Sequence, residues 1–224
     1  MNRRALEGYE KRFGSDHPNT LITLNNLALV LRRQGKYEES EAMNRYAIEG
    51  YEKRFGSDHP DTLMAVNNLA MVLWDQGRYE EAEVMNRRAL EGYKKRFGSD
   101  HPNTLSAVNN LSVLLLGRGK PIESEILSRR VLEGREKALG TDHPSVLSTI
   151  DNLAQALEVQ GKYSETQKPL QRALATHEST LGSEHLNVCK TLERLACLYE
   201  KQERYSQAEE AYEQAYKGFS RALG

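Results

Sequence analysis

A single motif recurs every 42 residues from one end of this chain to the other. Residues 1–20 are repeated at residues 85–104 with one difference, Glu10 against Lys94. No insertion or deletion interrupts the period, so each unit can stack on its neighbour in the same way. This pattern predicts a solenoid rather than a pair of globular domains. The period is marked by glycines at 14, 56, 98, 140, 182 and 224 and by histidines at 17, 59, 101, 143 and 185.

Each unit is predicted to hold two helices. In the first unit, one helix begins near Pro18, capped by Asp16 or His17, and ends before Gly35. The second helix is predicted from about Tyr37 to Phe55, close to 19 residues, and no window alternates with the period of a strand. The chain is therefore predicted to be all-α. The first helix should bury Leu21, Leu24, Leu27, Ala28 and Leu31, and the second should bury Ser40, Asn44, Ala47, Ile48, Tyr51 and Phe55.

Five complete units and one partial unit account for the whole chain. We predict one solenoid over residues 1–224, with the second helix of a truncated repeat at 1–14 and complete repeats at 15–56, 57–98, 99–140, 141–182 and 183–224. This gives eleven helices, and the start in mid-repeat suggests a piece of a longer array. In the fourth repeat, Pro169 lies inside the second helix, where it removes a backbone hydrogen bond. We expect a kink or a delayed helix start there.

Composition excludes several classes of protein. The chain has 31 Lys and Arg against 32 Asp and Glu, and no repeat is basic enough to attract a phosphate backbone, which disfavours nucleic acid as a partner. No stretch approaches the roughly 18 apolar residues of a membrane helix, and no signal peptide is recognisable, so a cytoplasmic location is expected. Cys189 and Cys197 lie eight residues apart in one predicted helix, too far to bridge, and are interpreted as small buried apolar residues.

The residues that usually carry chemistry do not form a recognisable site. The repeated histidines stand one per unit, whereas zinc ligands must all lie about 2 Å from one ion, so we interpret them as helix caps rather than metal ligands. There is no glycine-rich phosphate loop, and neither cysteine has a partner histidine at a repeat-compatible position. We predict no catalytic residues, no metal and no cofactor, and hence no enzyme.

The repeated residues resemble those of a known family. Leu27-Ala28, Leu31, Gly35, Tyr37 and Ala47, with Ala82 at the place of Ser40, are similar to the tetratricopeptide repeat (TPR) pattern. The 42-residue length, together with the LNNLA and YEEAE segments, resembles the kinesin-light-chain type of that repeat. The phrasing of residues 1–31 further resembles the C-terminal arrays of fungal STAND-type, immune receptor-like nucleotide-binding proteins. The fifth repeat departs from the pattern at Leu186, Glu193, Arg194 and Tyr212.

The resemblance implies a right-handed α-α superhelical solenoid whose first helices line a concave, peptide-binding side. On those helices a stripe opposite the core side carries an asparagine in four repeats. The side-chain amide of this asparagine could form hydrogen bonds with the backbone of a bound peptide. Alternatively, the asparagines could form hydrogen bonds with each other or with neighbouring carbonyls, and so set the stacking of the repeats. The candidate binding residues from this reasoning are Asn26, Leu29, Arg33, Asn68, Met71, Trp74, Asn110, Val113, Leu116 and Asn152.

An apolar group within this set is the strongest indication of function. The position of Trp74 is occupied by arginine, leucine or glutamate in other repeats, which is unlike a shared core position. Met71, Trp74, Val113 and Leu116 could therefore form an exposed recognition patch. The alternative is that Trp74 packs against a neighbouring helix.

We predict a non-catalytic module that binds a peptide or protein segment in the concave groove. The alternative is a regulatory, ligand-sensing or oligomerisation arm of a larger STAND-type nucleotide-binding protein. Head-to-tail self-association is also expected, because Leu6, Tyr9 and Phe13 in the unpaired first helix should lack their usual cover.

Overall fold

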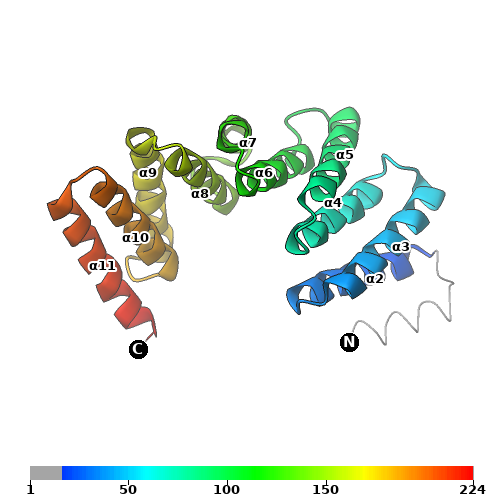
Figure 1. The fold of residues 1–224 in the computed structure, drawn as a ribbon, viewed down its shortest axis with the longest axis horizontal. Coiled ribbons are helices and arrows are strands. Elements are labelled where there is room, and N and C mark those ends of the chain that lie inside the picture. Colours follow the sequence, from blue (N-terminus) through cyan, green and yellow to red (C-terminus); the bar gives the residue numbers. More distant parts are fainter. Residues whose placement is uncertain (1–16, 224) are drawn as a thin grey trace. The chain divides into compact units, whose positions relative to one another are not determined.

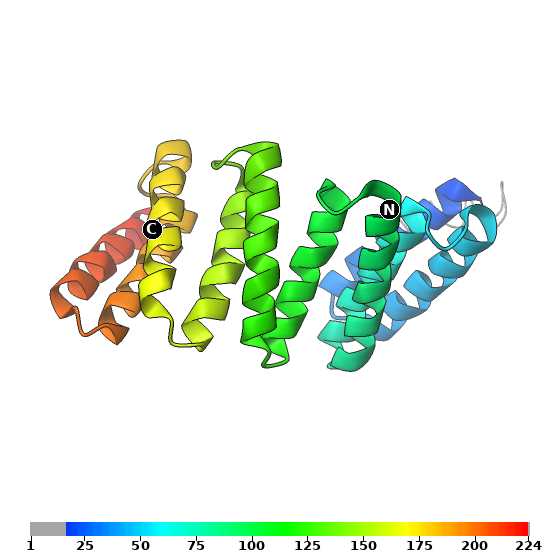
Figure 2. The same ribbon diagram turned by 90° about the horizontal axis from the view of Figure 1, so that it is seen from above.

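The computed structural model describes residues 17–223, and within that range all regular structure is helical (Figures 1 and 2). The first helix of each repeat has 16 residues, and the second has 19, which is the length predicted for it. The helix predicted at residues 1–14, with Leu6, Tyr9, Phe13 and the capping candidate Asp16, lies outside the described residues. The helices are α2 (Pro18–Arg33), α3 (Tyr37–Phe55), α4 (Pro60–Asp75), α5 (Tyr79–Phe97), α6 (Pro102–Gly117), α7 (Pro121–Leu139), α8 (Pro144–Val159), α9 (Tyr163–Leu181), α10 (Leu186–Lys201) and α11 (Tyr205–Leu223).

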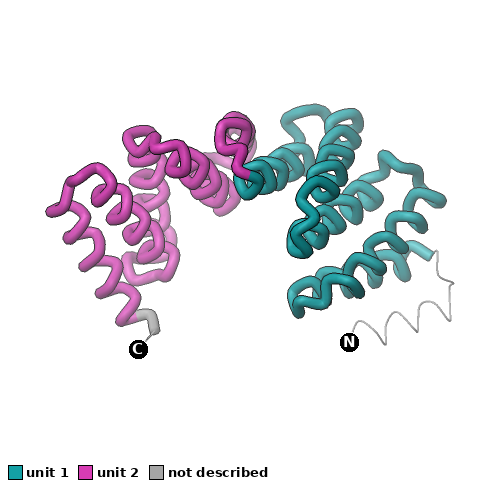
Figure 3. Tube along the Cα trace, viewed as in Figure 1, with its two compact units in different colours: residues 1–118 teal, residues 119–224 magenta. Residues whose placement is uncertain are grey.

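The helices divide between two compact units, residues 1–118 and 119–224 (Figure 3). In unit 1, the helices α2 to α6 pack each on the next along the chain. In unit 2, the helices α7 to α11 do the same. Each unit is thus a stack of antiparallel helices of the solenoid type, and the single solenoid over residues 1–224 stays a prediction.

The repeated histidines cap the first helices. The Nδ1 atom of His17 accepts a hydrogen bond from the backbone N–H of Asn19 at 3.2 Å, and the other four make the same bond two residues on. Each cap satisfies one of the N–H groups that a helix start leaves unpaired. His185 keeps this bond although Leu186 stands where the other repeats have proline. The capping role predicted for these histidines is confirmed.

A residue in the left-handed backbone conformation follows the end of each first helix. Gly35 has φ of +74° and donates to the carbonyl of Arg32, while the Lys36 N–H reaches back to Leu31, both at 3.0 Å. These two bonds define a Schellman motif. The fifth repeat forms the same turn with Glu203 at φ of +59°, the only non-glycine residue with positive φ in the described chain.

Large and small side chains alternate in the core. The leucine at the Leu27 position and the small residue after it are buried in all five repeats, as predicted. The predicted second-helix face is buried at Ser40, Asn44, Ala47, Ile48 and Tyr51. Phe55 is an exception, being 38% exposed with its ring stacked on His59 at 4.6 Å. The expectation of a buried Phe55 is wrong, because its ring packs on the capping histidine of the next repeat rather than in the core.

Two further expectations fail. For the fourth repeat, where a kink or a delayed helix start was predicted, the delayed start is wrong, because α9 begins at Tyr163 and continues through Pro169; the kink stays a prediction. Packing on the neighbouring helices therefore outweighs the loss of one backbone hydrogen bond. Cys189 is buried as predicted, but Cys197 is exposed, so the expectation of a buried side chain there is wrong. Cys197 shares its repeat position with Leu29 and lies on the exposed stripe of its helix.

Candidate functional site

Unit 1 presents an apolar band across its three first helices. Leu29 on α2, Met71 on α4 and Val113 on α6 occupy the same repeat position, and each is partly accessible to solvent. Trp74 and Leu116, three residues further along α4 and α6, are half-buried beside them. We call these five residues the apolar band. Each of its residues was predicted from the sequence, and the structure brings them together in one unit.

Polar side chains border the band. Asn26 and Arg33 are exposed on α2, and Asn68 and Asn110 are half-buried on α4 and α6. The remaining candidate, Asn152, is half-buried on α8. It therefore belongs to unit 2, whereas the other nine candidate residues belong to unit 1.

The asparagines bond from one repeat to the next. Asn68 donates its amide to the Oδ1 of Asn25 at 2.9 Å, and Asn110 donates to the Oδ1 of Asn67 at 3.1 Å. Asn67 also accepts from Asn86 on α5 at 3.0 Å. The stacking role weighed for these asparagines is confirmed at these two positions. A bound peptide could therefore form hydrogen bonds only with the amide groups of Asn68 and Asn110 that these bonds leave unused.

Unit 2 replaces the amide pair with an ion pair. Arg194 on α10 donates to Asp151 on α8 at 2.7 Å and to Glu158 at 3.1 Å. Burial raises the pKa of Asp151, an effect that the positive charges of Arg194 and His177 oppose. The pair thus joins the fourth and fifth repeats at the place where the amides of Asn25 and Asn68 join the first and second.

Trp74 both packs within unit 1 and contributes to its surface. Its ring lies 4.5 Å from the Tyr79 ring, centroid to centroid, at an interplanar angle of 54°. Its six-membered edge lies directly over Gly117, the last residue of α6, where a Cβ atom would overlap the indole. Trp74 thus makes the interhelix packing contact weighed as its alternative role, while the remainder of the half-buried ring faces solvent.

An ion pair holds the equivalent place one repeat earlier. Arg32, at the Trp74 position of the first repeat, donates to Asp75 at 2.6 Å and lies 3.7 Å from the Met71 sulfur. Asp75 in turn holds the position of Gly117. The two pairs, Arg32 with Asp75 and Trp74 with Gly117, therefore occupy equivalent positions, but the first is an ion pair and the second is a ring packed over a glycine. The first pair forms a charged border beside the apolar band.

Two of the hollows in unit 2 involve residues that sequence reasoning missed. One, of about 440 Å³, is lined by Val159, Tyr163, Cys197 and Leu198, with charged residues around it. The sequence contained a signal for this hollow, because Val159 is an apolar residue at the repeat position of the charged Arg33. In the structure, Val159 is 67% exposed. The other, of about 610 Å³, is lined by Asp151, His177, Lys190 and Arg194 among others. Burial lowers the pKa of His177, whose Nδ1 lies 3.3 Å from the Thr191 hydroxyl.

Within residues 17–223, no three His, Cys, Asp or Glu side chains gather as a metal site would require. Each capping histidine instead uses its Nδ1 lone pair for the helix start. In the same range, no helix combines the length and the apolar character that crossing a membrane demands.

Comparison with known proteins identifies the repeat. The tetratricopeptide repeat family model matches residues 1–53, 24–95, 61–137, 106–179 and 146–221. No curated protein matches the sequence.

Solved structures agree with this match. A structure described as kinesin light chain nearly identical TPR-like repeats, from Podosopora anserina, is 25% identical with a TM-score of 0.82, covering 92% of this chain and 98% of its own. BtubC (BKLC) from P. vanneervenii is 18% identical with a TM-score of 0.88, over 100% of this chain and 90% of its own. YrrB, described as a TPR protein with an unusual peptide-binding site, is 15% identical with a TM-score of 0.60, over 97% of this chain and 93% of its own.

Proposed function

The chain belongs to the tetratricopeptide repeat family, and on that premise we propose that it is a non-catalytic protein-interaction module. Its ligand is an extended protein segment that binds across the first helices of unit 1. The observation that carries this proposal is the apolar band, in which three successive repeats place an accessible apolar side chain at one position. An accessible apolar patch with a polar border is typical of recognition surfaces.

The composition of the band defines the ligand. Leu29, Met71 and Val113 favour apolar side chains presented along one face of the segment, since burying them is the main source of affinity. Met71 adapts to ligands of different shape because its thioether chain is flexible. Arg33, exposed at the end of α2, favours an acidic side chain or a terminal carboxylate at that end of the segment.

The comparisons support binding of this kind. YrrB is described as having a peptide-binding site, and its fold matches this chain over nearly the full length of both. The alternative role, as an arm of a larger STAND-type nucleotide-binding protein, stays a prediction, as does the cytoplasmic location.

The test begins with selection of binding peptides from a random phage-displayed library. Affinity of the best peptide is then measured by calorimetry on the wild type and on Trp74→Ala. We expect the variant to bind about 30-fold more weakly, equivalent to ~2 kcal/mol, as loss of an aromatic anchor does. Tyr46→Ala is the control, because Tyr46 is an exposed aromatic residue on the second helix α3.

Stability is measured in parallel, since Trp74 also packs on Tyr79. The free energy of unfolding should fall by less than the binding free energy does. Unchanged affinity with reduced stability would assign Trp74 to packing alone and overturn its role in binding.

A further inference from the structure

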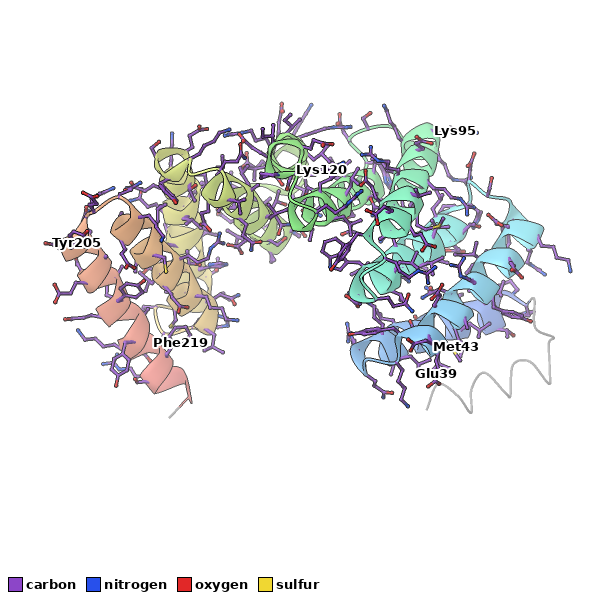
Figure 4. The ribbon with its side chains drawn as sticks, viewed as in Figure 1. Glu39, Met43, Lys95, Lys120, Tyr205 and Phe219 are labelled. Carbon is purple, nitrogen blue, oxygen red and sulfur yellow. The ribbon has the colours of Figure 1, made fainter. Side chains whose placement is uncertain are left out.

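The larger of the two hollows described in unit 2, of about 610 Å³, is lined by residues of α8, of α10 and of the end of α9. The three helices lie together in Figure 4, which draws their side chains as sticks. We call this space the α8–α10 hollow. Its volume falls within the range of small-molecule sites, about 300–1,000 Å³.

In unit 1 a tyrosine of the chain fills the corresponding space. Tyr93 on α5 is buried, and its hydroxyl donates to the carbonyl of Pro60, at the start of α4, at 3.4 Å. In unit 2 the same repeat positions hold His177 and Pro144, and both residues line the α8–α10 hollow. Because an imidazole is shorter than a phenol, the room that the outer part of the Tyr93 side chain fills in unit 1 stays open in unit 2.

A second exchange enlarges this space. Phe97, one turn after Tyr93, stacks its ring on the capping His101 with 4.3 Å between the ring centroids. In unit 2 the phenylalanine position is held by Leu181, which lines the hollow, as does the capping His185. A leucine is smaller than a phenylalanine, so the two exchanges together leave room for an aromatic ring that does not come from the chain itself.

His177 offers the hollow a hydrogen-bond acceptor. It is only 6% exposed, and its Nδ1 lies 3.3 Å from the Thr191 hydroxyl. That hydroxyl donates its one proton to the carbonyl of Asn187 at 2.9 Å, so it can only accept from His177. Burial lowers the pKa of His177, so the ring is neutral near neutral pH and its proton is on Nδ1. The lone pair of Nε2 has no partner among residues 17–223, and a ligand hydroxyl can donate to it.

Lys190 supplies the free positive charge of the lining. Arg194 also lines the hollow, but its guanidinium is bound to Asp151 at 2.7 Å and to Glu158 at 3.1 Å. Lys190 is exposed and forms no ion pair with any described residue. The other unpaired charge of the lining is Asp142, in the turn before α8, which repels a carboxylate at that end. A carboxylate in the hollow is therefore directed to Lys190.

We propose that the α8–α10 hollow binds a small aromatic carboxylic acid that carries a phenolic hydroxyl. The ring lies in the room that the Tyr93 side chain fills in unit 1, the hydroxyl donates to Nε2 of His177, and the carboxylate pairs with the ammonium of Lys190. Leu147 and Leu181 provide apolar surface for the ring. This site lies in unit 2, whereas the proposed protein segment binds on the apolar band of unit 1, so either proposal can fail without the other.

The test is isothermal titration calorimetry of the full chain at neutral pH. The probes are para-hydroxybenzoate, para-hydroxyphenylacetate and para-hydroxyphenylpropionate, which differ in the distance from hydroxyl to carboxylate. We expect at least one probe to bind one site per chain with a dissociation constant below about 1 mM. Its analogues without the hydroxyl or without the carboxylate should each bind at least about tenfold more weakly, because each lacks one polar contact. No binding by any probe, or equal binding by both analogues, would overturn the proposal.

A double variant tests whether the probe occupies the hollow. His177→Tyr combined with Thr191→Ala gives unit 2 the residues that unit 1 has at these positions, Tyr93 and Ala107, which are both buried. We therefore expect the fold to be retained, as measured by circular dichroism and thermal unfolding, while the added ring fills the hollow and abolishes binding. Full affinity in the folded double variant would overturn the proposal.

A lysine variant tests the charge and leaves the core unchanged. Lys190→Ser introduces the residue found at the equivalent Ser148, and it should weaken binding at least about tenfold. Lys168→Ser is the matched control, because Lys168 is exposed on α9 and is not part of the lining, so its affinity should equal that of the wild type. Equal affinities of the two lysine variants would show that Lys190 does not bind the carboxylate and would overturn the proposal.

Discussion

Trp74 can lie across α6 only because Gly117 has no side chain. A Cβ atom in Gly117→Ala would overlap the far edge of the indole, so the ring must move by about 1 Å or rotate away. Overpacking of this kind costs about 1–3 kcal/mol, and the better helix propensity of alanine returns up to about 1 kcal/mol. We therefore expect a net loss of about 1 kcal/mol in the free energy of unfolding.

The displacement itself can be followed by fluorescence, because Trp74 is the only tryptophan in the chain. Emission of folded Gly117→Ala should shift to longer wavelength as the ring becomes more exposed. Gly92→Ala is a matched control, since its Cβ would overlap Leu63 rather than the indole. It should destabilise the fold without shifting the emission. An unshifted spectrum for Gly117→Ala would refute this account of how Trp74 is positioned.

Three further changes test the fold. Glu203→Gly should raise the free energy of unfolding by about 0.5–1 kcal/mol, because only glycine adopts positive φ without cost. A lower free energy of unfolding, measured by urea denaturation, would contradict this. Pro169→Ala should stabilise by about 1–3 kcal/mol, by restoring a helical hydrogen bond; thermal unfolding that is unchanged would show that α9 carries no such penalty. Burial opposes ionisation of Glu125, but hydrogen bonds led by that from Lys162 lower its pKa to about 2. The ionised Glu125 should therefore stabilise the fold fully above pH 4.5, and this contribution should be lost as the pH falls towards 2. In Glu125→Gln, the urea concentration at the midpoint of unfolding should depend less on pH between these values.

The helices follow from the sequence because each boundary is set locally. His59 caps one helix start with its own side chain, and Gly35 supplies the positive φ at a helix end, so neither depends on distant contacts. Glu203 shows the limit of this reasoning. Tertiary packing imposes a left-handed conformation there that the residue itself disfavours.

The candidate site was predicted less completely because its contacts run between repeats. The variable position of Trp74 suggested exposure, but the glycine that receives its ring lies 43 residues later and has meaning only once α4 and α6 are adjacent. Cysteines are commonly buried, which predicts a buried Cys197, but its repeat position is shared with the partly exposed Leu29 and indicates exposure.

Val113 provides the most direct test of the central claim, that the apolar band of unit 1 binds a protein segment. Val113 is 41% exposed on α6, and Val84 is 59% exposed on the second helix α5 of the same unit. Each is changed to aspartate, and the affinity of a peptide selected on the wild type is measured with both variants. Val113→Asp should bind at least tenfold more weakly, because a charge would be desolvated in the band, while Val84→Asp should match the wild type. Equal affinities of both variants and the wild type would contradict the claim.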